Sequence, residues 1–106
     1  MTVIENYDDA DNVLLNLGLA NPGELSAKVA LARKLNELIE QSGLSQTETA
    51  AITGMTQPKV SQVRRFKLQN ISLERLMQAL VSLDQHVEIV VRSAQKAKKY
   101  GITVVV

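Results

Sequence analysis

The 106-residue sequence has no cysteine and a single histidine, His86, and these two scarcities exclude most catalytic and metal chemistry. Without cysteine the chain can form no disulfide, no thiolate metal site and no cysteine nucleophile. One histidine cannot form a two-histidine metal site or a histidine–cysteine relay. Because His86 opens a strand-like run, we expect it to be structural. We therefore expect that the protein is not an enzyme.

Metal and nucleotide sites are equally poorly supported. Asp8, Asp9 and Asp11 form an acidic cluster that could suit a metal, but acids are common at helix starts, where they face the positive end of the helix dipole. Gly54 has no glycine-rich neighbours, so no phosphate-cradling loop is present. We expect no metal and no cofactor.

Aromatic residues are scarce, with two Tyr, one Phe and no Trp, so the core must be aliphatic. Hydrophobic residues still make up 45% of the chain, which suits one folded domain. No apolar run approaches the roughly 20 residues of a membrane helix. The first residues, MTVIENYDDAD, are acidic, unlike a secretory signal. These features indicate a cytoplasmic protein.

Acidic residues are absent between Glu48 and Glu74, a window that contains Lys59, Arg64, Arg65 and Lys67. Residues 1–24 carry five acids and no Lys or Arg (−5), and the remainder carries twelve Lys and Arg against six acids (+6). Such a run is commonly just a solvated face. Because it coincides with the helix pair described below, we interpret it as a phosphate-binding surface.

The spacing of apolar residues predicts a mainly α-helical fold. A short helix is expected within residues 7–18, and a long amphipathic helix from Pro22 or Glu24 to Ser42. A further helix is expected from Ser72, its N-cap, to about Asp84, with Ile71 and Leu76 forming a hydrophobic staple.

The stretch Gln46–Arg65 predicts two short helices joined by a tight turn. SQTE at residues 45–48 is a capping box that starts the first of them, and Gly54 ends it. Pro58 is accommodated in the first turn of the second. Val60, Val63 and Phe66 are expected to point inward, which leaves the polar residues outside.

After the last expected helix, the spacing of apolar residues changes from a helical to a strand-like period. HVEIVVR at residues 86–92 alternates and is rich in β-branched residues, which predicts a strand, and the final ITVVV is a second strand-like run. Because a lone strand leaves its backbone groups unpaired, we predict that two copies form a homodimer through residues 86–92.

The stretch Gln46–Arg65 has the side chains that a DNA-reading helix-turn-helix requires. Gln57 and Gln62 could each pair with adenine, and Arg65 could donate to guanine or phosphate. Gln46 lies at a helix N-terminus, which favours an anion. The other phosphate candidates are Lys59, Arg64, Lys67 and Asn70. The alternative is that these are ordinary exposed residues of a helical bundle.

The chain resembles a known family at these positions. The helix-turn-helix of Cro and phage-repressor-like (XRE-type) regulators has the spacing seen here in Gln46, Ala50, Gly54, Val60 and Val63. The resemblance extends from about Asn16 to Arg92. Through TQPKVS, SLERLMQAL and HVEIVVR the chain is similar to the small HigA-type antitoxins.

The resemblance implies a five-helix, repressor-like DNA-binding domain that dimerises and represses a promoter, often its own. Two positions depart from the family pattern: Pro58 stands where repressors often place a base-reading side chain, and Phe66 where relatives often carry a glycine-containing turn. The implied groove contacts are Thr56, Gln57, Ser61, Gln62 and Arg65, with Gln46 near a phosphate.

We therefore predict a homodimeric, sequence-specific repressor whose partner is double-stranded DNA with a palindromic operator. Its expected parts are an acidic segment (1–24), a helix-turn-helix domain (25–84) and a C-terminal β extension (85–106). The alternative function is that of an antitoxin in a HigBA-like pair. The acidic segment, with Val13, Leu14 and Leu17, would then lie across a basic toxin protein. The two functions are compatible.

Overall fold

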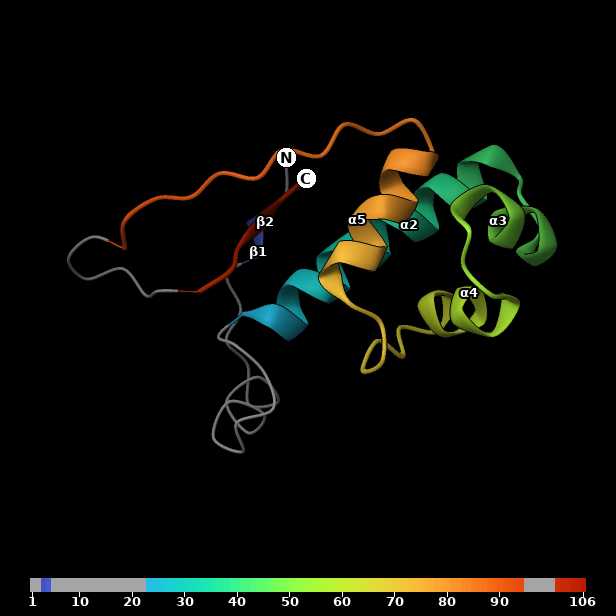
Figure 1. The fold of residues 1–106 in the computed structure, drawn as a ribbon, viewed down its shortest axis with the longest axis horizontal. Helices are drawn as coiled ribbons and strands as arrows, with labels where there is room; N and C mark the ends of the chain where they lie inside the picture. The colour runs from blue at the N-terminus through green and yellow to red at the C-terminus, as the bar shows by residue number, and fades with distance from the viewer. Residues whose placement is uncertain (1–2, 5–22, 95–100) are drawn as a thin grey trace.

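The structure, a computed structural model, describes residues 3–4, 23–94 and 101–106 (Figure 1). Its elements are β1 (Val3–Ile4), α2 (Glu24–Ser42), α3 (Gln46–Thr53), α4 (Gln57–Arg64), α5 (Leu73–Ser82) and β2 (Val104–Val105). Of the five helices expected, this part of the chain contains four. The short helix expected within residues 7–18 lies outside the described residues.

The long helices α2 and α5 lie side by side, and α3 and α4 pack at one end of this pair (Figure 1). No helix of the described segments combines the length and apolar character needed to cross a bilayer. The buried cluster between the helices contains no aromatic residue, as the composition predicts; it consists of Leu31, Ala32, Leu35, Ile39, Met55, Val60, Val63, Leu68, Ile71, Leu76, Ala79 and Leu80.

The start of α5 follows its local sequence signals. The Ser72 hydroxyl accepts a hydrogen bond from the Arg75 backbone N–H at 3.0 Å, which makes Ser72 the N-cap. Ile71 and Leu76 are 2% and 0% exposed, in agreement with a hydrophobic staple. The predicted beginning of this helix is confirmed, and the helix ends at Ser82.

The predicted strand at residues 86–92 is wrong for the single chain. This segment leaves α5 as a drawn-out arm with no strand beside it (Figure 1). Alternating apolar and polar residues favour an extended segment, but a β-strand forms only when a neighbouring strand completes the hydrogen-bond ladder. Within the described residues nothing provides that neighbour.

Two residues of the final ITVVV run do form a strand, and its partner lies near the other end of the chain. Val104 and Val105 in β2 pair antiparallel with β1, opposite Ile4 and Val3 respectively. The two strands contact α2 at the end away from α3 and α4 (Figure 1).

Gly23 allows the C-terminal residues to reach α2. It caps the helix with φ 78°, in the left-handed region. A Cβ built at this position would lie 2.5 Å from the Ile102 carbonyl oxygen, so only glycine leaves room for the Ile102 backbone.

We predict that Gly23→Ala displaces the C-terminal residues and destabilises the fold by about 2 kcal/mol or more, because strain and a backbone clash add. Gly43→Ala is the matched control. Gly43 also has a positive φ, 65°, but a Cβ there would meet nothing within 4 Å, so this change should cost about 1 kcal/mol. Denaturant unfolding gives the free energies, and amide exchange at Val104 and Val105 reports the pairing. Equal losses in the two variants would contradict the close contact.

Candidate nucleic-acid interface

The helix α3 is held at its start by the predicted capping box. The Ser45 hydroxyl accepts from the Glu48 N–H at 3.0 Å, and the Ser45 N–H donates to the Glu48 carboxylate at 2.9 Å. The Gln46 side-chain amide donates to the carbonyl oxygen of Gln57 at 3.2 Å. The first turns of α3 and α4 are therefore joined directly.

The turn between the two helices is fixed from both sides. Gly54 ends α3 in the left-handed region with φ 75°, and its N–H donates to the carbonyl of Ala50. From α5, the Arg75 guanidinium donates to the Thr53 carbonyl at 3.1 Å and so satisfies a free carbonyl at the end of α3. Met55, inside the turn, is 5% exposed and belongs to the core.

The helix α4 begins where its sequence predicts. Thr56 is the N-cap, its hydroxyl accepting from the Lys59 N–H at 3.3 Å, and Pro58 lies in the first turn. Val60 and Val63 are 2% and 1% exposed and attach the helix to the core. Phe66 is 44% exposed, so the expectation that it points inward is wrong.

The five predicted base-reading residues divide into two groups. Thr56, Gln57 and Arg65 are exposed, at the two ends of α4. Ser61 and Gln62 are half-buried, and the Gln62 Oε1 atom is buried without a hydrogen-bond partner in the described structure. A base contact by Gln62 requires its amide to rotate outward, whereas Gln57 is accessible as it stands.

Among the predicted phosphate contacts, Lys67 is the most available. It is exposed, and within the described residues its ammonium has no hydrogen bond or ion pair. Lys59 is half-buried, and its ammonium donates to the Asn70 carbonyl at 2.7 Å, which ties α4 to the following loop. Gln46 and Asn70 are exposed.

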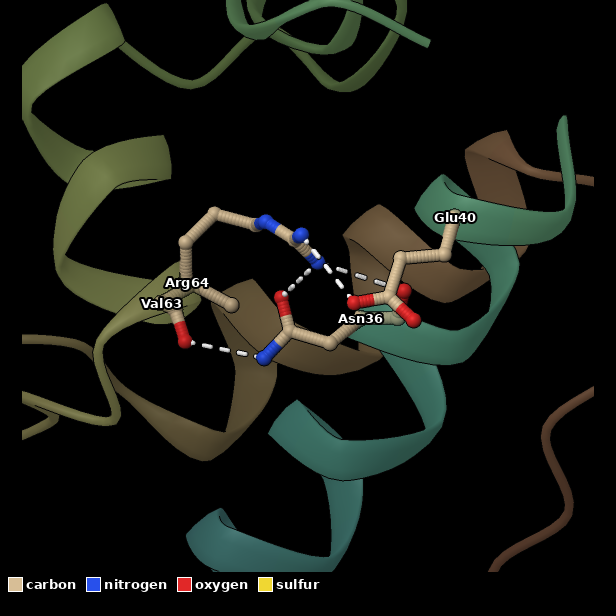
Figure 2. Close-up of polar contacts among 4 residues, drawn as sticks. All are labelled: Asn36, Glu40, Val63 and Arg64. Atoms are coloured by element: carbon tan, nitrogen blue, oxygen red, sulfur yellow. Dashed lines mark hydrogen bonds and ion pairs between the residues drawn. The ribbon is translucent and has the colours of Figure 1, made fainter. Parts of the chain in front are cut away.

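Arg64 differs from these residues because its guanidinium is held within the molecule (Figure 2). It donates to the side-chain oxygen of Asn36 at 2.9 Å and to the Asn36 carbonyl at 3.3 Å. It also forms an ion pair with Glu40 at 3.2 Å. A phosphate contact by Arg64 would require the guanidinium to leave these α2 partners.

Asn36 is a buried polar residue of α2 that the motifs of the sequence do not single out. It is only 7% exposed, and its amide also donates to the Val63 carbonyl at 3.0 Å (Figure 2). We call Asn36, Glu40, Val63 and Arg64 the Asn36 bridge. The signal that could have revealed it is position, since Asn36 directly follows the core residue Leu35 and lies one turn after Ala32.

The surface has few groups for chemistry other than binding. Among the described residues, no group of three or more His, Asp or Glu is placed to hold a metal. Asp8, Asp9 and Asp11 lie outside those residues. His86 is exposed at the start of the arm, 3.3 Å from Glu88.

Two comparisons with known proteins agree with this geometry. Residues 13–92 match a family model described as a helix-turn-helix domain. A solved structure named as an XRE family transcriptional regulator is 45% identical in sequence, with a TM-score of 0.65. The similarity covers 73% of this chain and 86% of that chain. No curated protein sequence matches.

The capping box makes the stability of α3 depend on pH. Hydrogen bonds from the backbone N–H and the hydroxyl of Ser45 hold the pKa of Glu48 below its ordinary value of 4.5. A carboxylate whose pKa is lower in the folded state stabilises the fold fully above pH 4.5. That contribution is lost as the pH falls through the lower, folded-state pKa.

We predict that Glu48→Ala lowers the Tm at pH 7 and that this deficit shrinks as the pH falls below 4.5 and the wild-type carboxylate becomes protonated. Thermal unfolding followed by circular dichroism over a series of pH values measures it. Glu74→Ala is the control, because the Glu74 carboxylate accepts from the Gln78 side chain and not from its N-cap. A Glu48→Ala deficit that stays constant with pH would disprove the role of the ionised carboxylate.

Proposed function

The chain belongs to the helix-turn-helix family of XRE-type DNA-binding transcriptional regulators, and from that membership we propose that it is a repressor that binds a palindromic operator as a homodimer. In this proposal α4 enters the major groove of DNA, and α3 contacts the DNA backbone with its N-terminus towards a phosphate.

The observation that supports this proposal best is the combination of charge and exposure around α4. The part of the chain from Thr49 to Leu73 has four cations and no acid. Thr56 and Gln57, at the N-terminal end of α4, are exposed. Residues at this end of a recognition helix contact base edges. A polyanion is the partner that such a surface fits.

The proposed contacts follow from accessibility. Gln57 offers an amide that can bond adenine in the major groove, and Arg65 can donate to guanine. Lys67 and the α3 N-terminus would bind phosphates, which gives affinity without sequence information. The remaining proposed base contacts are Thr56, Ser61 and Gln62, and the remaining phosphate contacts are Gln46, Lys59, Arg64 and Asn70.

We predict that Gln57→Ala and Lys67→Ala have different effects on DNA binding. Gln57→Ala should weaken operator binding by about 1–3 kcal/mol and relax specificity, because a base contact is lost. Lys67→Ala should weaken binding to all DNA sequences alike and reduce the slope of log affinity against log salt by about one. The measurement is a gel-shift titration at several salt concentrations, with an operator found by footprinting DNA upstream of the protein's own gene.

Arg64→Ala is the comparison variant for Lys67→Ala. Because the Arg64 guanidinium already has partners on α2, Arg64→Ala should lower the stability of the protein. It should change the salt slope of DNA binding less than Lys67→Ala does. If Gln57→Ala left operator preference intact, Gln57 would not be a reading residue. If the wild-type protein protected no DNA, the proposed function itself would be wrong.

The homodimer is supported by the arm at residues 86–92. Ile89, Val90 and Val91 are 75%, 64% and 91% exposed, which is unusual for three consecutive apolar residues. A two-fold axis that sets the arm beside its own copy would create an antiparallel ladder and cover these side chains. Such a dimer would present two α4 helices to successive major grooves, about 34 Å apart.

We predict that Val91→Asp converts the dimer to a monomer without unfolding it, because Val91 packs against nothing in the single chain. Sedimentation equilibrium gives the mass, and circular dichroism reports the fold. Val81→Asp, at a 55% exposed position on α5, is the control and should remain dimeric. Dissociation caused by Val81→Asp and not by Val91→Asp would move the interface to α5.

An antitoxin role is the second candidate function, and the charge of the N-terminal segment favours it. Residues 1–24 carry five acids and no Lys or Arg, so this segment would complement a basic toxin protein of the HigBA-like kind. Most of it lies outside the described residues. A small basic reading frame beside the gene would favour the antitoxin role, and an isolated gene would favour a plain regulator.

A further inference from the structure

The C-terminal ends of α2, α4 and α5 share one hydrogen-bond pattern. In each, a residue just beyond the helix (the first after α2, the second after α4 and α5) has a positive φ. Its N–H bonds three residues back, and the next N–H bonds five residues back. This is the Schellman motif, in which glycine normally occupies the left-handed position. The three residues at that position are Gly43 (φ 65°), Phe66 (φ 56°) and Asp84 (φ 65°).

Phe66 is the least suitable of these three residues. Glycine takes the left-handed conformation without cost, and Asp tolerates it because its short side chain can bond locally. A phenylalanine gains neither advantage, and its Cβ crowds the backbone. The motif at the end of α4 is nevertheless fully formed, with Phe66 N–H to Val63 at 3.1 Å and Lys67 N–H to Gln62 at 2.8 Å.

Burial of the ring does not explain why this strain is kept. Phe66 is 44% exposed. A strained residue that leaves this much of its surface in solvent suggests a use outside the fold.

The surroundings of the ring indicate what it would contact. Phe66 lies between Arg65 and Lys67, both exposed, at the point where α4 ends. The loop beyond it is joined back to α4 by Lys59 and Asn70. In the proposed interface Lys67 faces a phosphate and Arg65 donates to a base, and the apolar surface that DNA offers between phosphate and base is the deoxyribose.

We propose that Phe66 is a DNA-contacting residue whose ring packs on a deoxyribose next to the phosphate that Lys67 binds. This rests on the proposed function of DNA binding. The ring is partly exposed in the free protein, and the complex removes that exposed part from water. Because a deoxyribose is the same in every nucleotide, the contact adds affinity without specificity.

The test uses the opposite effects that Phe66→Gly should have on the free protein and on the complex. Relief of the left-handed strain should raise the Tm by about 4 °C. Loss of the ring should weaken DNA binding by about tenfold, for operator and unrelated DNA alike. The salt slope should not change, because no charge is removed.

Two further variants separate the ring from the backbone. Phe66→Ala also removes the ring but keeps a Cβ, so it should lose the same affinity without the gain in Tm. Asp84→Gly changes the same motif at the end of α5, so it should not lower the Tm and should not weaken DNA binding.

Three results would overturn the proposal. Wild-type affinity in Phe66→Ala would mean that any loss in Phe66→Gly comes from loop flexibility. Wild-type affinity in both variants would show that the ring does not contact DNA. The proposed function would stand in that case, provided that the wild-type protein binds DNA. A fall in sedimentation mass for Phe66→Ala would place the ring in the contact between two copies.

Discussion

The position of α4 depends on one buried amide, that of Asn36. Apolar contacts through Val60 and Val63 hold α4 against the core, but such contacts are not directional. The Asn36 amide adds direction, because it bonds both the Val63 carbonyl and the Arg64 guanidinium at the end of the helix. A buried polar group is costly unless its partners are in place. The Asn36 bridge therefore favours one rotation of α4, and with it one exposed face.

Features with local causes were predictable from the sequence. The capping box at Ser45, the first-turn position of Pro58 and the staple at Ile71 depend only on residues within one or two turns, and the structure has all three. The spacing of apolar residues predicted α2 correctly for the same reason, because an amphipathic helix is recognised from residues within the helix itself. Together these signals located α3 and α4, and so the candidate interface, before any contact was known.

Features that depend on distant partners were not predictable. The hydrogen bonds of Asn36 are one example, because nothing near it in sequence indicates the Val63 carbonyl twenty-seven residues away. The alternation of residues 86–92 indicates an extended chain but not a neighbour, and β2 instead pairs with Val3 and Ile4. The exposure of Phe66 follows from a left-handed backbone, which a residue other than glycine rarely adopts.

The contact of Ile102 with Gly23 has a thermodynamic consequence for assembly. The arm beyond α5 is anchored at one end by that helix, and the chain after it is anchored again where β2 meets β1 and α2. A segment with both ends fixed samples far fewer conformations than a free tail of the same length. A second copy that paired with the arm would meet a partly preorganised strand and lose less entropy on association. The two residues of β1 would thus influence the dissociation constant of an interface they do not touch.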